Sequence, residues 1–287
     1  MIRLFLIIVL LLPSIGQAQL DLRQASREIL PNGMTLIILE EHSFPSVSVQ
    51  MLYRVGGRDE QYGRTGIAHF LEHMAFRATE NFPDTDVVSR IYAAGGEWHG
   101  YTWVDQTTYY STVPDEQLDL LLRIEADRMQ RLLIEPRWIE AEKGAVLAEM
   151  HGYENDPASV LHDAVVFTAL QGHPYRNNVI GWESDIQALQ HADVVDFYQS
   201  HYRPANAVLV VVGQVQAGQV RQRVLELFGA TLPPKRQPCH IPLSPSRLAY
   251  AALSCWVLVR LLLLRLPIRR HLQMMQISLR CWYSRSG

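Results

Sequence analysis

The chain has 287 residues and 48% hydrophobic content, which is typical of a globular protein with one large domain or two ordinary ones. Its formal net charge of −3 gives no excess of positive charge, so we predict no nucleic-acid partner. All three cysteines (Cys239, Cys255 and Cys281) lie near the C-terminus, which excludes a disulfide framework and a cysteine-based zinc site in the main body.

The first 18 residues predict an export signal. Arg3 provides the charged start, residues 4–13 form an apolar run, and residues 14–18 supply small residues for a cleavage site. We expect cleavage after Ala18 and a periplasmic or secreted mature protein. The apolar run is shorter than the ~20 residues that cross a bilayer, so we expect no stable membrane anchor; a retained anchor is the alternative.

Strands are predicted in the first half of the remaining chain. Residues 28–30 and 34–39 flank a turn at residues 31–33, and strict alternation over residues 47–53 predicts a half-buried strand. A glycine-containing loop at residues 63–66 leads into a helix. A second helix over residues 84–93 should end at Gly95-Gly96, and residues 97–101 and 107–113 predict two paired strands.

Helices predominate after residue 114. Leucines at helical spacing predict a core-facing helix through residue 133, and Pro136 begins another that reaches about Tyr153. Helices at 158–170 and 193–201 precede a valine-rich strand at 207–212. Because strands and helices do not alternate strictly, we predict an α+β fold.

The helix after residue 66 carries a candidate metal site. His69, Glu72 and His73 share the side opposite the apolar stripe, and two imidazoles four residues apart can reach one Zn²⁺. A hydrolytic zinc site takes three protein ligands, so a carboxylate is missing. Glu142 and Glu149 are candidates because they share one face of a later helix. The alternative is a solvated helix face that carries two histidines and a glutamate.

These residues resemble the M16 family of zinc peptidases, which includes pitrilysin, insulin-degrading enzyme and the mitochondrial processing peptidase. The pattern H-x-x-E-H at residues 69–73 is followed by 75 intervening residues and then Glu149, with Glu142 seven residues before it. The resemblance covers about residues 28–232 and extends to Gly57-Arg58-Asp59-Glu60, Gly95-Gly96-Glu97-Trp98, Ala126-Asp127-Arg128-Met129, His173-Pro174-Tyr175 and Tyr202-Arg203-Pro204.

The resemblance implies a two-layer sandwich, a mainly antiparallel sheet with helices on one face. It implies that His69, His73 and Glu149 bind one Zn²⁺, that Glu72 is the general base and that Glu142 orients the site. The expected function is that of an exported zinc endopeptidase whose extended peptide or unfolded polypeptide substrate adds to the strand edge at residues 95–101.

Three departures from the family and two other functions remain. The family usually has Asn at the position of His99, Pro at that of Asn178 and Asp at that of Gln214. His99 could alter substrate contacts or compete for the metal. The alternative functions are a non-catalytic partner subunit and an inactive fragment, because family members pair this domain with a second similar domain or subunit.

The end of the chain differs in composition from the rest. None of the 61 residues from 227 to 287 is Asp or Glu, whereas ordinary usage predicts about seven acidic residues in a segment of this length. We predict a signal peptide at 1–18, the catalytic domain at 19–232 and a poorly ordered basic tail at 233–287 that is truncated or read out of frame. An amphipathic basic segment and a membrane helix interrupted by Arg260 and Arg265 are the alternatives.

Overall fold

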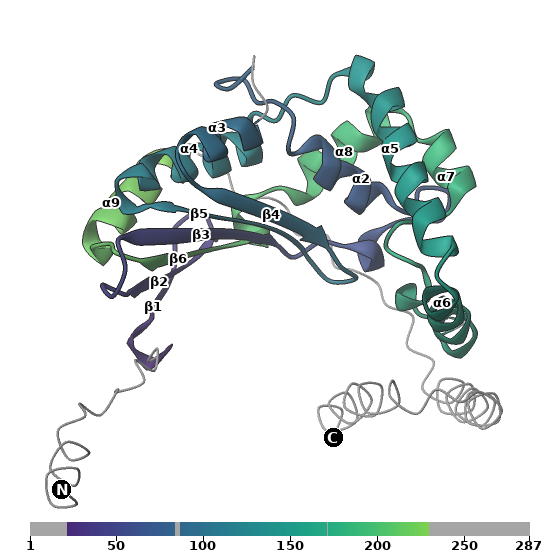
Figure 1. Cartoon of the computed structure of the whole chain (residues 1–287), viewed down its shortest axis with the longest axis horizontal. Coiled ribbons are helices and arrows are strands. Elements are labelled where there is room, and N and C mark those ends of the chain that lie inside the picture. Colours follow the sequence, from purple (N-terminus) through teal and green to yellow (C-terminus); the bar gives the residue numbers. More distant parts are fainter. Residues whose placement is uncertain (1–21, 84–86, 171, 230–287) are drawn as a thin grey trace, which may run out of the picture.

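The computed structural model describes residues 22–83, 87–170 and 172–229. Within them, six strands form one sheet in the order β1-β2-β6-β3-β5-β4 (Figure 1). Only β2 and β6 pair in parallel; the other neighbours are antiparallel. The strands are β1 (Ser26–Ile29), β2 (Thr35–Glu40), β3 (Ser46–Tyr53), β4 (Glu97–Thr102), β5 (Thr107–Pro114) and β6 (Ala207–Gly213).

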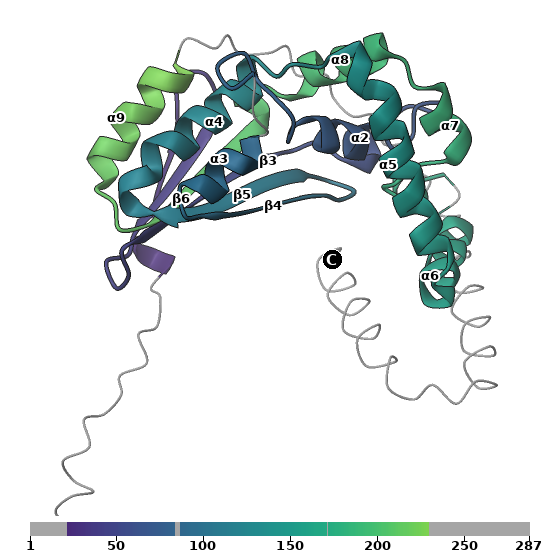
Figure 2. The same cartoon turned by 45° about the horizontal axis from the view of Figure 1, so that its top comes forward.

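The helices form two groups. In Figures 1 and 2, α3, α4 and α9 cover one face of the sheet, whereas α2, α5, α7 and α8 gather beyond one end of it. Their bounds are α2 (Ile67–Met74), α3 (Val87–Ala93), α4 (Leu118–Gln130), α5 (Pro136–Glu154), α6 (Pro157–Ala169), α7 (Glu183–Ala188), α8 (His191–His201) and α9 (Ala217–Phe228). The α+β class and the mainly antiparallel sheet with helices on one face are confirmed.

The core lies between the sheet and its helical layer. Alternate residues of β3 (Val47, Val49, Met51 and Tyr53) are at most 1% exposed, which is the pattern expected of a strand buried on one face. Leu121 and Leu122 of α4 belong to the same buried cluster. This packing holds the sheet in place, and with it β4, the edge strand that lies beside α2.

Some boundaries differ from those predicted. The helix expected to reach residue 133 ends at Gln130, because the following backbone bonds elsewhere: the Leu132 amide donates to the Tyr198 hydroxyl and the Leu133 amide to the Ala78 carbonyl. The helices α7 and α9 were not predicted. Gly95 and Gly96 do end α3 as expected, since their amides donate to the Tyr92 and Ile91 carbonyls.

Several predictions concern other parts of the chain. The signal peptide at 1–18, its cleavage after Ala18 and the tail at 233–287 lie outside the described residues. In the described part, none of the helices combines the length and the apolar character needed to cross a bilayer.

Candidate metal centre

The loop before α2 sets the position of the helix. The Glu60 carboxylate accepts hydrogen bonds from the amides of Gly66 and Ala68, at 2.9 and 3.0 Å, and so satisfies two donors at the helix N-terminus. Ile67, Phe70, Leu71 and Met74 are buried in the core, as the sequence pattern predicts. The opposite side of α2 therefore faces α5 and β4.

Three side chains from α2 and α5 converge on one point. His69 Nε2 lies 3.6 Å and His73 Nε2 3.5 Å from Glu149 Oε2. One ligand atom from each residue lies within 4.8 Å of the others, so the group can hold a metal ion. The helical spacing of the two histidines brings their ring centres to 4.7 Å.

The hydrogen bond at Nδ1 of His73 determines the protonation of Nε2, the ring nitrogen that faces this group. Nδ1 lies 3.1 Å from Glu142 Oε2, and because an ionised carboxylate can only accept, Nδ1 is the donor. A neutral His73 then turns the lone pair of Nε2 toward Glu149. Two acceptors that face each other at 3.5 Å favour a cation between them.

The environment gives the two histidines different pKa values. Burial, together with the neighbouring His73, lowers the pKa of His69 to about 4, so the His69 ring is neutral near pH 7. Burial also acts to lower the pKa of His73, but the hydrogen bond and charge of Glu142, with the charges of Glu72 and Glu149, raise it overall. His69 is thus available as a ligand over a wide pH range.

Glu142 links the group to Arg77. Its carboxylate accepts from His73 and forms an ion pair with the Arg77 guanidinium. Burial acts to raise the pKa of Glu142, but these two hydrogen bonds, together with the charges of Arg77 and His73, outweigh burial and lower it. Glu142 therefore stays ionised and orients the His73 ring.

Glu72 lies beside the group without joining it. Its side chain is buried, and Oε2 accepts a hydrogen bond of 2.6 Å from the Thr102 hydroxyl of β4. Burial raises the pKa of Glu72, while the Thr102 hydrogen bond lowers it. A hollow of about 780 Å³ opens next to Glu72 and His73, with Phe76, Trp98 and Trp138 in its walls.

His99 points away from the metal group. Along β4 the residues Trp98, Gly100 and Thr102 are the more buried ones, whereas His99 is exposed and stacks on Tyr110 with ring centres 4.9 Å apart. Because successive strand residues face opposite sides, His99 lies on the other face of the sheet from Thr102 and Glu72. It is therefore not placed to compete for the metal.

All five site residues named from the sequence lie in this one region. His69, His73 and Glu149 converge, Glu142 contacts His73, and Glu72 lies beside them. Three contacting residues were missed: Arg77, Thr102 and Tyr153. Tyr153, whose hydroxyl interacts with the Glu149 carboxylate, carries a sequence signal because it follows Glu149 by one turn of α5. Arg77 lies beyond the end of α2, and Thr102 reaches Glu72 from a strand, so helical spacing predicts neither contact.

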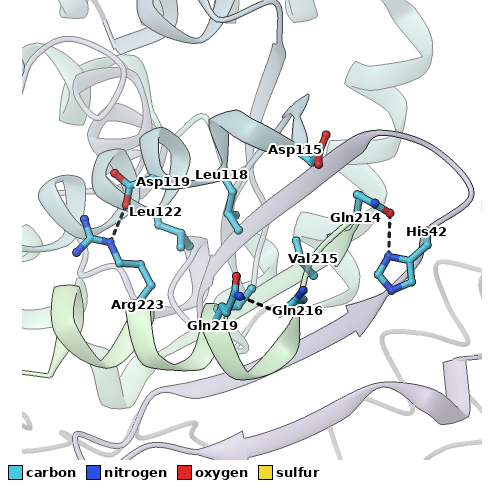
Figure 3. A pocket seen from close by; sticks show the side chains of 11 residues that line it. His42, Asp115, Leu118, Asp119, Leu122, Gln214, Val215, Gln216, Gln219 and Arg223 are labelled. Carbon is cyan, nitrogen blue, oxygen red and sulfur yellow. Dashed lines mark hydrogen bonds and ion pairs between the residues drawn. The ribbon is translucent and has the colours of Figure 1, made fainter.

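A second hollow, of about 470 Å³, lies between α4, α9 and the loops beside them (Figure 3). Several of its polar side chains are paired with one another: Asp119 with Arg223 at 2.6 Å, and His42 with Gln214 at 2.8 Å. Gln214, one of the departures from the family, thus has a local partner. No residue of the metal group lines this hollow.

Comparison with known proteins gives one consistent family. The profile described as Insulinase (Peptidase family M16) matches residues 36–182, and that described as Peptidase M16 inactive domain matches residues 188–255. An uncharacterized zinc protease of Streptomyces coelicolor is 31% identical over 215 residues, covering 74% of this chain and 47% of its own. The beta subunit of the mitochondrial-processing peptidase of Bos taurus is 29% identical, covering 76% of this chain and 44% of its own.

A solved structure agrees with the sequence comparisons. The crystal structure of a protease from Helicobacter pylori superposes with a TM-score of 0.72 at 28% identity, covering 76% of this chain and 53% of that one. The chain thus spans about half the length of the proteins that it matches.

Proposed function

This chain belongs to peptidase family M16, the insulinase family, and from that membership we propose that it is a zinc-dependent endopeptidase that acts on extended peptides. The observation that carries the proposal is the convergence of His69, His73 and Glu149 with Glu72 beside them. Two imidazoles and one carboxylate are a donor set typical of hydrolytic zinc sites.

The geometry of the group fits zinc. Zinc–ligand distances of about 2.0–2.2 Å place tetrahedral ligands about 3.3–3.6 Å from one another. The separations of 3.6 and 3.5 Å from Glu149 Oε2 to the two Nε2 atoms agree with this spacing. They are too long for good hydrogen bonds, so direct pairing does not explain the arrangement.

Different side chains are proposed to act in different steps of peptide hydrolysis. Bound zinc would supply a Lewis acid that polarises the substrate carbonyl and acidifies a water molecule. Glu72 is the proposed general base: it takes a proton from the attacking water and returns it to the leaving amine. Glu142, held by Arg77, keeps the His73 ring oriented.

The substrate strand is proposed to add to β4. This strand is at the end of the sheet order, so one of its edges has no partner strand among the described residues. An extended peptide can pair with such an edge through main-chain hydrogen bonds. β4 carries both Gly100 and Thr102 next to Glu72, so a peptide on this edge would lie close to the proposed base.

The proposal also includes the location of the protein and a second domain. The N-terminal sequence supports a periplasmic or secreted location, as argued above. Because the relatives are about twice as long, we propose that a second M16-like domain or subunit completes the active enzyme. The alternatives are a non-catalytic partner subunit and an inactive fragment; the complete set of His69, Glu72, His73 and Glu149 favours the catalytic function.

Metal content and hydrolysis, measured on the same preparation, test this proposal. The mature chain should bind about one zinc and cleave an internally quenched peptide, and chelation should stop cleavage. His73→Ala should lose both zinc and cleavage, since only two ligands remain. Stoichiometric zinc in His73→Ala would contradict the ligand set, whereas zinc without any cleavage in the wild-type chain would favour the non-catalytic alternatives.

A further inference from the structure

Thr102 connects the edge strand to the proposed base. It is the last residue of β4, its side chain is 9% exposed, and its hydroxyl lies 2.6 Å from Glu72 Oε2. An ionised Glu72 can only accept, so the Thr102 hydroxyl donates. The other neighbour of this hydroxyl, Thr107 Oγ1, is 3.5 Å away and competes weakly for its single proton.

A second hydrogen bond supports this direction. The Thr107 hydroxyl donates its single proton to the Val55 carbonyl at 3.0 Å, so it cannot donate to Thr102. Thr102 therefore keeps its own proton for the Glu72 carboxylate.

The two oxygens of Glu72 consequently have different surroundings. Oε2 is held by Thr102, whereas Oε1 lies beside Gly100, where a Cβ atom would approach it to 3.2 Å. Gly100 and Glu72 both line the large hollow next to His73. One oxygen is thus fixed to the protein, and the other lies beside a residue in the wall of the space available to a water molecule and a peptide.

We propose that Thr102 is a positioning residue for peptide hydrolysis, whose hydroxyl holds Glu72 with Oε1 toward the reacting water. The inference rests on the proposed function, because Glu72 must be the base for its orientation to affect the rate. A carboxylate that rotates away from the water loses the alignment that proton transfer requires, and small misplacements of a catalytic group are costly.

Three variants test the role of the hydroxyl. Thr102→Val keeps the shape and removes the hydroxyl, and Thr102→Ser keeps the hydroxyl. Thr108→Val is the matched control, because Thr108 is a buried threonine of the neighbouring strand whose hydroxyl has no hydrogen-bond partner in the described structure. Single-turnover hydrolysis with the mature chain in excess gives the maximal rate constant and the half-saturating concentration for each variant.

The expected result separates positioning from folding. Thr102→Val should keep one zinc and the half-saturating concentration but lose roughly tenfold or more in the maximal rate. Thr102→Ser and Thr108→Val should stay within about threefold of wild type, a difference too small to need a change in Glu72 alignment. An unchanged rate in Thr102→Val, or a serine variant as slow as the valine variant, would overturn the proposal.

Crystal structures of the zinc-loaded chain provide a readout that needs no activity. Glu72 should keep one orientation in the wild type and in Thr102→Ser, and leave it in Thr102→Val. If the wild type cleaves nothing, the proposed function fails, yet this comparison still tests the link between Thr102 and Glu72. The same Glu72 orientation in all three structures would refute the inference.

Discussion

At the scale of single residues, position distinguishes the carboxylate proposed to bind zinc from the one proposed to act as the base. Glu149 points at both Nε2 atoms, whereas Glu72 is bonded to Thr102 and is not a member of the metal group. Glu72→Gln should therefore keep about one zinc and lose roughly 10²–10⁴-fold in the rate of peptide cleavage, because an amide cannot accept the proton. Metal analysis and a peptide assay on the same samples measure both effects.

Glu149→Gln is the comparison for that experiment. The amide oxygen is a weaker, neutral ligand, so this variant should bind zinc less tightly than Glu72→Gln does. Equal loss of zinc in the two variants would make Glu72 a ligand and would contradict its assignment as the base.

Glu142 contacts the proposed metal site through His73. Glu142→Gln removes the charge that orients the His73 ring and pairs with Arg77, so the zinc affinity should fall by about 10–100-fold. Glu140→Gln is the control on the same helix, because the Glu140 side chain is 80% exposed and pairs with Lys143. Competition with a fluorescent zinc chelator measures both, and equal affinities would show that Glu142 plays no part in binding.

At the scale of elements, the loop before α2 holds this helix, which carries His69 and His73, in place. Gly66 has a φ of +82°, and a Cβ there would lie 2.4 Å from the Ile180 carbonyl oxygen. Gly63 has a similar φ of +84° but no atom within 4 Å of its Cβ position. Gly63→Ala should cost about 1–2 kcal/mol from the backbone conformation alone, and Gly66→Ala at least about 2 kcal/mol more. Urea unfolding of both variants measures these losses of stability. Equal losses in the two variants would show that the Ile180 backbone shifts to make room for the added Cβ.

Glu60 gives α2 a pH-dependent anchor. Burial raises the pKa of Glu60 to about 8, although the amides of Ala68 and Gly66 lower it. Between the ordinary pKa of 4.5 and about 8 the unfolded chain loses this proton while the folded chain keeps it, so stability falls as the pH rises. Urea midpoints of zinc-free wild type and Glu60→Gln at pH 5 and pH 8 measure the effect. The wild type should lose more stability than the variant between the two values; equal losses would contradict the raised pKa.

The elements also show what the sequence can predict. The alternation in β3 and the two faces of α2 are local patterns, and both are present in the structure. The parallel pairing of β2 with β6 joins residues about 170 positions apart, which no local pattern encodes. Thr102 was missed for the same reason, since its partner is 30 positions away on another element. Val220, Val224 and Phe228 have helical spacing, a local signal from which α9 could have been predicted.

At the scale of the whole molecule, the described domain leaves the proposed site open on one side. The hollow beside Glu72 and His73 and the free edge of β4 have no second domain over them among the described residues. Catalysis benefits from a site that excludes water and fixes the scissile bond. We therefore expect the chain alone to bind peptide but cleave it slowly, at least about a hundredfold more slowly than after a second M16-like domain is added.

Deleting residues 239–287 separates this explanation from a contribution of the tail. Every side chain of the metal group and its contacts lies between Glu60 and Tyr202, so the shortened chain should keep one zinc and the same slow rate. Adding a separately expressed second M16-like domain should raise the rate of both forms equally, because the added domain would close the site in both. Metal analysis, thermal unfolding and peptide cleavage compare the two forms. Fast cleavage by the intact chain that disappears on deletion would show that the tail takes part in catalysis and that no second domain is needed.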